Sequence, residues 1–136
     1  MTQLDTLSLA EVNEAADRLV AAFAGTDTDG YFACFAEDAS FVFHPEAEVL
    51  ADRAAYERLW ASWLSDGWRV ESCTPTGRRV QVWGDTAVLT HDVHTVTSVA
   101  GDQTATDERE TIVFRRVGGA VLAVHEHLSP APEATR

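Results

Sequence analysis

Three pairs of turn-forming residues divide the second half of the chain into long runs of strand-forming residues. The pairs are Gly84-Asp85, Gly101-Asp102 and Gly118-Gly119. The runs around them are rich in valine, threonine and tryptophan, and they cover residues 68–83, 86–99, 103–117 and 120–129. Glycine beside aspartate or a second glycine is a strong signal for a two-residue hairpin. The pattern therefore predicts an antiparallel meander in which each strand pairs with the next.

Strands of this length cannot stay flat in so small a protein. At ~3.3 Å per residue, a 15-residue strand extends about 50 Å. A chain of 136 residues folds to a diameter of roughly 37 Å. We therefore expect the sheet to bend, at Pro75-Thr76-Gly77, and to wrap around the elements on one face as a cone with an open mouth.

The first half of the chain has the residue spacing of helices. Ser8 and Glu11 match a capping box at the start of an apolar stripe with helical periodicity. A second, shorter helix is expected over residues 28–37. A third is expected over residues 53–65, where apolar side chains again recur every three or four positions.

A short aromatic strand at residues 41–43 separates the second helix from the third, and Pro45 ends it. Helices followed by a run of strands indicate an α+β fold. We expect a cone-shaped barrel in which three N-terminal helices pack on a strongly curved antiparallel sheet. Residues 1–130 would form one domain and residues 131–136 a flexible tail.

The charge balance excludes several classes of function. The chain has 10 basic and 22 acidic residues, a net charge of −12, and no lysine. A nucleic-acid partner is therefore not expected, and neither Schiff-base nor P-loop chemistry is available. No apolar run approaches the ~20 residues of a membrane helix, and residues 1–5 lack the features of a signal peptide. We expect a cytoplasmic protein with no membrane partner, in which Cys34 and Cys73 are reduced thiols.

The order of these elements resembles that of the nuclear transport factor 2-like superfamily. The segment Phe35-Ala36-Glu37-Asp38-Ala39 and the aromatic strand after it are most similar to the SnoaL-like branch, which also includes ketosteroid isomerase. Residues 124–129 resemble the closing strand of one SnoaL-like subgroup and of the kinase-II association domain. The resemblance covers about residues 9–130 and implies the fold. It implies no single activity, because the superfamily includes isomerases, cyclases, dehydratases, binding domains and assembly modules.

Counting residue pairs outward from the three turns predicts which side chains share a face of the sheet. With two-residue turns, Ile112 would lie opposite both His91 and His125, and Glu110 would lie opposite His127. One bulge would move the side chains of a strand to the other face. The side chains expected on the cavity face are His91, Glu110, Ile112, Phe114, His125 and His127. The resemblance supports this face, because Glu110 matches the oxyanion-hole aspartate of ketosteroid isomerase.

Three residues are candidates for acid–base catalysis. His44 precedes a proline, at the place where the resemblance puts the general-base aspartate of ketosteroid isomerase, and His127 is the other candidate base. Glu110 is either a general acid kept neutral by apolar neighbours or one half of a histidine–carboxylate pair. Leu19 follows Arg18 where the family has its oxyanion tyrosine, so steroid isomerase activity is not expected.

The remaining candidates have both a functional and a structural interpretation. The expected ligand-binding side chains, some of which could instead be core, are Tyr31, Phe35, Trp60, His91, Ile112, Phe114 and His125. His125 and His127 could transfer protons, bind a metal or be structural. A zinc ion would also need His91 and Glu110, and we predict neither a metal nor a cofactor.

We expect this protein to bind a small, mostly apolar organic molecule in the cone, with cofactor-independent acid–base chemistry of the isomerase, cyclase or dehydratase type. The alternative is a non-catalytic binding or association module. In either case we expect a homodimer formed through the exposed face of the sheet. The sequence does not identify the ligand.

Overall fold

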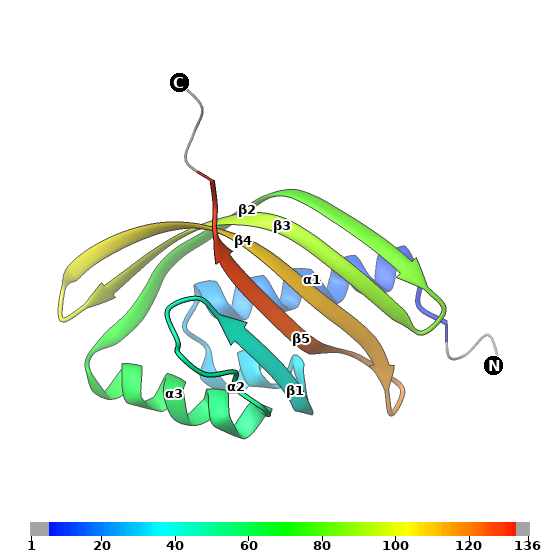
Figure 1. Ribbon diagram of the computed structural model, residues 1–136, viewed down its shortest axis with the longest axis horizontal. Helices are drawn as coiled ribbons and strands as arrows, with labels where there is room; N and C mark the ends of the chain where they lie inside the picture. The colour runs from blue at the N-terminus through cyan, green and yellow to red at the C-terminus, as the bar shows by residue number, and fades with distance from the viewer. Residues whose placement is uncertain (1–5, 133–136) are drawn as a thin grey trace.

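The computed structural model describes residues 6–132 and has helices followed by strands (Figure 1). The helices are α1 (Leu9–Ala24), α2 (Thr28–Phe32) and α3 (Arg53–Ser65). The strands are β1 (Phe35–Phe43), β2 (Trp68–Trp83), β3 (Thr86–Val99), β4 (Asp102–Val117) and β5 (Ala120–Pro130). Residues 1–5, where no signal peptide is expected, and residues 133–136 of the expected tail lie outside the described residues.

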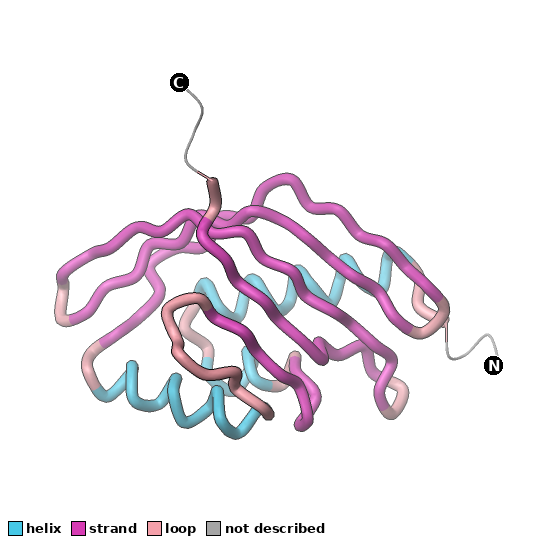
Figure 2. The backbone as a smooth tube through the Cα atoms, viewed as in Figure 1, coloured by secondary structure: helices cyan, strands magenta, loops and turns pink. Residues whose placement is uncertain are grey.

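The strands form one curved, unclosed sheet in the order β1-β5-β4-β3-β2. Strands β2 to β5 are the predicted antiparallel meander. Strand β1 pairs in parallel with β5, so the sheet is mixed rather than purely antiparallel. All three helices lie beneath the concave face of the sheet (Figures 1 and 2). The α+β architecture is thus confirmed, with one parallel edge strand that the sequence pattern did not reveal.

The second helix is shorter than predicted and the first strand is longer. Helix α2 ends at Phe32, and Phe35 already pairs with Ala123 of β5. The amide of Ala123 also donates to the carbonyl of Cys34, at 2.9 Å. Because the edge of β5 offers backbone partners, sheet pairing prevails over the helical spacing of this segment.

The backbone of the sheet has an irregularity within β2 and an early turn after β3. Strand β2 departs from regular pairing between Thr76 and Arg79, and Gly77 there has φ +69°. This is the predicted bend. The turn between β3 and β4 is Ala100-Gly101, one residue earlier than predicted, because Val99 pairs with Asp102 and both turn residues have positive φ.

The helix starts follow the predicted local rules. The Ser8 hydroxyl accepts from the amide of Glu11 at 3.1 Å, and the Glu11 carboxylate accepts from the amide of Ser8 at 3.0 Å. Asp52 caps α3 by accepting from the amide of Ala55 at 2.8 Å. None of the helices in residues 6–132 is long and apolar enough to cross a membrane.

A cluster of aromatic side chains packs between the helices and the sheet. Trp60 is 1% exposed, stacks on Tyr31 with ring centroids 5.0 Å apart, and donates its indole N–H to the Thr28 hydroxyl at 2.9 Å. Tyr31 also contacts Phe35 edge to face, at 5.1 Å. These rings fix the positions of α2 and α3 under the sheet, next to the cavity described below.

Candidate ligand-binding site

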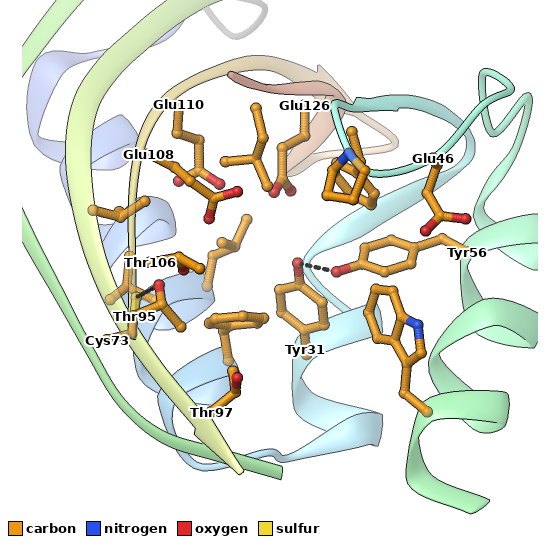
Figure 3. Close-up of a pocket in the computed structure, with 18 of the residues that line it drawn as sticks. Tyr31, Glu46, Tyr56, Cys73, Thr95, Thr97, Thr106, Glu108, Glu110 and Glu126 are labelled. Atoms are coloured by element: carbon orange, nitrogen blue, oxygen red, sulfur yellow. Dashed lines mark hydrogen bonds between the residues drawn. The ribbon is translucent and has the colours of Figure 1, made fainter. Parts of the chain in front are cut away.

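A cavity of about 310 Å³ lies between the helices and the concave face of the sheet. Much of its wall is apolar or aromatic. The side chains of this kind are Leu19, Val20, Phe23, Phe43, Pro45, Trp63, Trp68, Val93 and Leu128. The polar side chains on the wall are Tyr31, Glu46, Tyr56, Cys73, Thr95, Thr97, Thr106, Glu108, Glu110 and Glu126, and they are labelled in Figure 3.

Three carboxyl groups from β4 and β5 point toward one another at one end of the cavity: Glu108, Glu110 and Glu126 (Figure 3). Glu110 is 8% exposed and Glu126 is 3% exposed. Burial raises the pKa of Glu126 well above its ordinary value, and the neighbouring Glu110 carboxylate raises it further. Glu126 therefore keeps its proton at pH values where exposed glutamates are ionised.

His91 supports Glu110 from behind the cavity wall. Its Nε2 lies 2.6 Å from Glu110 Oε1, and its side chain is fully buried. Among residues 6–132, none is a hydrogen-bond partner of His91 Nδ1. With a proton on Nε2, His91 donates a hydrogen bond to the Glu110 carboxyl. His91 thus fixes the orientation of the Glu110 carboxylate without reaching the cavity.

His44 has a similar relation to Glu108. Its Nε2 lies 2.6 Å from Glu108 Oε2, and its side chain is 34% exposed. His44 follows β1, beside Pro45 and Glu46, which are part of the cavity wall. It therefore contacts a cavity carboxylate without being part of the wall itself.

Two phenol groups and one thiol complete the polar lining. The hydroxyls of Tyr31 and Tyr56 are 3.0 Å apart. Burial raises the pKa of both phenols well above the ordinary value, so both remain protonated and can donate hydrogen bonds. Burial also raises the pKa of Cys73 to about 11, which makes this thiol a poor nucleophile near neutral pH.

The predicted places of His125 and His127 are wrong, because β5 contains a bulge. Phe114 pairs with Ala123 and Val113 pairs with His125, which leaves Val124 as an extra residue. A one-residue bulge reverses the faces of all later side chains. Both imidazoles therefore lie on the outer face, where His127 is exposed and His125 Nδ1 contacts the Ser40 hydroxyl at 2.8 Å.

The same bulge turns Glu126 into the cavity, and the sequence analysis missed this residue. Residues 121–124 are four apolar residues in a row, so no alternation of polar and apolar positions shows which face each one occupies. Glu108 was also missed, although it lies two residues before Glu110 on the same strand and therefore on the same face.

The other predicted site residues divide between the cavity and the core. Tyr31 and Glu110 line the cavity. His91 lies on the predicted face, although it pairs with Glu110 rather than Ile112, because the earlier turn shifts the register by two residues. The residues that lie in the core instead of on the cavity wall are Phe35, Trp60, Ile112 and Phe114.

No three histidine, cysteine, aspartate or glutamate side chains between residues 6 and 132 are arranged to hold a metal ion. The three carboxyls converge in the cavity without forming such a group. What the site offers instead is a buried carboxyl, Glu126, that keeps its proton beside Glu110, with the hydroxyls of Tyr31 and Tyr56 on the same cavity wall.

A sequence profile of the SnoaL-like domain matches residues 12–133, which is most of the chain. This chain belongs to the SnoaL-like domain family. The family assignment agrees with the order of helices and strands described above. No curated protein sequence matches this SnoaL-like chain.

Solved structures similar to this SnoaL-like domain share its fold. One is a nuclear transport factor 2-like superfamily protein from Salmonella enterica, with a TM-score of 0.78, 18% identity and coverage of 92% of both chains. Another is an NTF2-like protein of unknown function in nutrient uptake from Rhodospirillum rubrum, with a TM-score of 0.77, 21% identity and coverage of 89% of this chain and 98% of that one.

A third similar structure comes from Streptomyces avermitilis and is provisionally named a dehydratase from the NTF2-like family. Its TM-score is 0.76, its identity is 22%, and the match covers 91% of this chain and 97% of that one. At these identities the similarity establishes the shared fold of the SnoaL-like domain. The chemistry must be argued from the cavity itself.

Proposed function

We propose that this protein binds a small, mostly apolar organic molecule in the cavity and transfers protons to and from it without a cofactor. The observation that carries the proposal is the buried Glu126 carboxyl, whose pKa is raised by burial and by the neighbouring Glu110, at the end of an otherwise largely apolar cavity. A carboxyl held neutral by burial is the usual form of a general acid at neutral pH. The fold and family are consistent with an isomerase or dehydratase type of reaction.

The paired carboxyls supply both halves of an acid–base step. One carboxylate accepts a proton from the ligand while the neighbouring carboxyl donates a proton to a different ligand atom, so the pair ends with the same number of protons. The Tyr31 and Tyr56 hydroxyls lie on the same wall and are hydrogen-bonded to each other, so one of the two O–H groups is free to donate to a carbonyl oxygen that gains negative charge. In this proposal Glu126 is the acid and Glu110, which the sequence analysis proposed as the acid, is the carboxylate that accepts the proton.

The predicted bases need revision in this proposal. His127 is exposed on the outer face of the sheet and cannot reach a ligand in the cavity. His44 contacts Glu108 at 2.6 Å, and we assign it the role of positioning that carboxylate at the cavity mouth. Neither imidazole is needed for the step at Glu110 and Glu126.

Binding in the cavity can be tested with a neutral fluorescent ketone, 6-propionyl-2-dimethylaminonaphthalene (Prodan). We expect Prodan to bind to the wild-type protein with a blue shift of its emission, because most of the wall is apolar. Replacing Cys73 with tryptophan places a large side chain in the cavity and is expected to weaken Prodan binding at least about tenfold.

The matched control is Ser72→Trp, on the neighbouring exposed position of the same strand. This variant should bind Prodan like the wild type. Equal Prodan binding by Cys73→Trp and Ser72→Trp, with both proteins folded by circular dichroism, would show that the cavity is not a ligand site.

A non-catalytic association module that forms a dimer through the outer sheet face remains the second candidate. Polar pairs occupy that face, including His94 with Asp107 at 2.7 Å and Asp92 with Arg109 at 3.6 Å. Such a module would have no use for a protonated carboxyl inside the cavity. The pH behaviour of Glu126 therefore separates the two candidates.

A further inference from the structure

The cavity wall carries acidic groups without basic ones. Of the residues that line it, Glu46, Glu108, Glu110 and Glu126 are acidic and none is an arginine, and the chain has no lysine. Elsewhere on the protein, acidic side chains pair with arginines, as Glu11 does with Arg116 at 2.7 Å. The protein as a whole is acidic, with a net charge of −12, and the cavity differs from such surface pairs because no arginine lines it beside its acidic side chains.

Glu126 provides an independent sign that a ligand belongs at this end of the cavity. Its side chain is 97% buried and points toward the carboxyls of Glu108 and Glu110 (Figure 3). Its Oε2 atom is buried and has no hydrogen-bond partner among the described residues. Buried acceptors in proteins are almost always paired, because an unpaired one loses its hydrogen bonds to water. A hydrogen-bond donor on a ligand would satisfy this atom.

Aromatic rings form the wall on the helix side of the cavity. The ring centroids of Trp63 and Trp68 are 5.1 Å apart, and that of Phe23 is 6.5 Å from Trp68. Tyr31 and Tyr56 continue this wall toward the carboxyls. Aromatic faces bind apolar groups and also attract cations through their negative π surface.

We propose that the ligand is an organic amine in its protonated form, with the ammonium group among Glu108, Glu110 and Glu126 and the apolar part against the aromatic rings. The ammonium N–H groups would supply the missing donor to Glu126 Oε2, and the positive charge would lie beside the Glu108 and Glu110 carboxylates. An anionic ligand would meet like charge at the same place. This inference rests on the proposed function, because it names the class of molecule that enters the same cavity.

Three probes that share a phenylbutyl group test the inference: 4-phenylbutylamine, 4-phenylbutan-1-ol and 4-phenylbutanoate. Each is titrated at pH 7 against the full chain loaded with Prodan, and its dissociation constant is taken from the loss of Prodan emission. We expect the amine to bind at least about tenfold more tightly than the alcohol. The carboxylate should bind most weakly.

Removing two of the carboxylates should abolish this preference. In the double variant Glu108→Gln/Glu110→Gln, we expect the amine to lose about tenfold or more in affinity while the alcohol changes by less than about threefold. The control Glu14→Gln/Glu57→Gln makes the same change in net charge on exposed helix positions and should leave all three affinities unchanged.

The outcomes separate this inference from the proposed function. If Prodan binds in the cavity but the amine binds no more tightly than the alcohol, or fails to displace Prodan, the amine inference is wrong and the cavity remains a binding site. Prodan binding that is insensitive to Cys73→Trp would overturn both. An amine preference that persists in Glu108→Gln/Glu110→Gln would place the cation elsewhere and would also contradict the inference.

Discussion

Replacing Glu126 with glutamine is expected to stabilise the protein at pH 7, with an increase in melting temperature of roughly 4–8 °C, or about 1–2 kcal/mol in the free energy of unfolding. Glutamine has nearly the same shape as the protonated carboxyl and carries no charge. At pH 7 the Glu126 carboxyl is ionised in the unfolded chain but must stay neutral in the folded one, which costs free energy. The substitution removes this cost. Thermal denaturation from pH 4 to pH 9 measures the effect.

The sign of the pH dependence follows from the raised pKa of Glu126. In the unfolded chain this group titrates at the ordinary value, near 4.3, whereas in the folded chain it titrates at a higher pH because of burial and the neighbouring Glu110 charge. The folded protein therefore binds more protons between these two pKa values. The wild-type free energy of unfolding must fall as the pH rises through this window.

Glu126→Gln has no such titration, so the stabilities of the variant and the wild type should converge at pH 4 and separate above it. Glu57→Gln, an exposed change on α3, should follow the wild type at every pH. A melting temperature of Glu126→Gln that is unchanged or lower at pH 7 would contradict the raised pKa.

Replacing Trp60 with alanine is expected to cost about 3–5 kcal/mol of stability. Trp60 is 1% exposed, packs on Tyr31 and loses its hydrogen bond to Thr28 in this variant. Chemical denaturation gives the free energy of unfolding directly. An effect of this size would identify Trp60 as core rather than ligand wall.

The matched control is Trp83→Ala at the end of β2, where the tryptophan is 57% exposed. We expect a change within about 0.5 kcal/mol there. If Trp60→Ala were as mild as this control and yet abolished Prodan binding, Trp60 would be part of the ligand site, as its position on the buried stripe of α3 first suggested.

Local rules predicted the elements of this fold well. The four meander strands and the third helix lie where residue spacing and turn residues put them, because hairpin turns and helix caps depend on neighbouring residues. The parallel pairing of β1 with β5 depends on two segments some 85 residues apart, such as Ser40 and His125. No local pattern in residues 35–37 signals that pairing.

The candidate site was predicted less well than the fold. One extra residue on β5 accounts for most of the wrongly placed side chains. Each side chain on β4 was placed on the correct face because its strand pairs regularly with β3. On β5, the extra residue Val124 exchanges the faces, so Glu126 replaces the two histidines inside the cavity. The cavity volume depends on how the aromatic rings pack, which residue spacing does not determine.

The most direct test of the account is a pH titration of the glutamate side-chain carboxyl carbons by ¹³C NMR, with Glu126→Gln and Glu110→Gln spectra to assign the two signals. We predict one carboxyl in the wild type that stays protonated well above the ordinary glutamate range, and whose signal is lost in Glu126→Gln. If every glutamate titrated near its ordinary pKa, Glu126 would not keep its proton at neutral pH, and the proposed acid–base chemistry would have no basis.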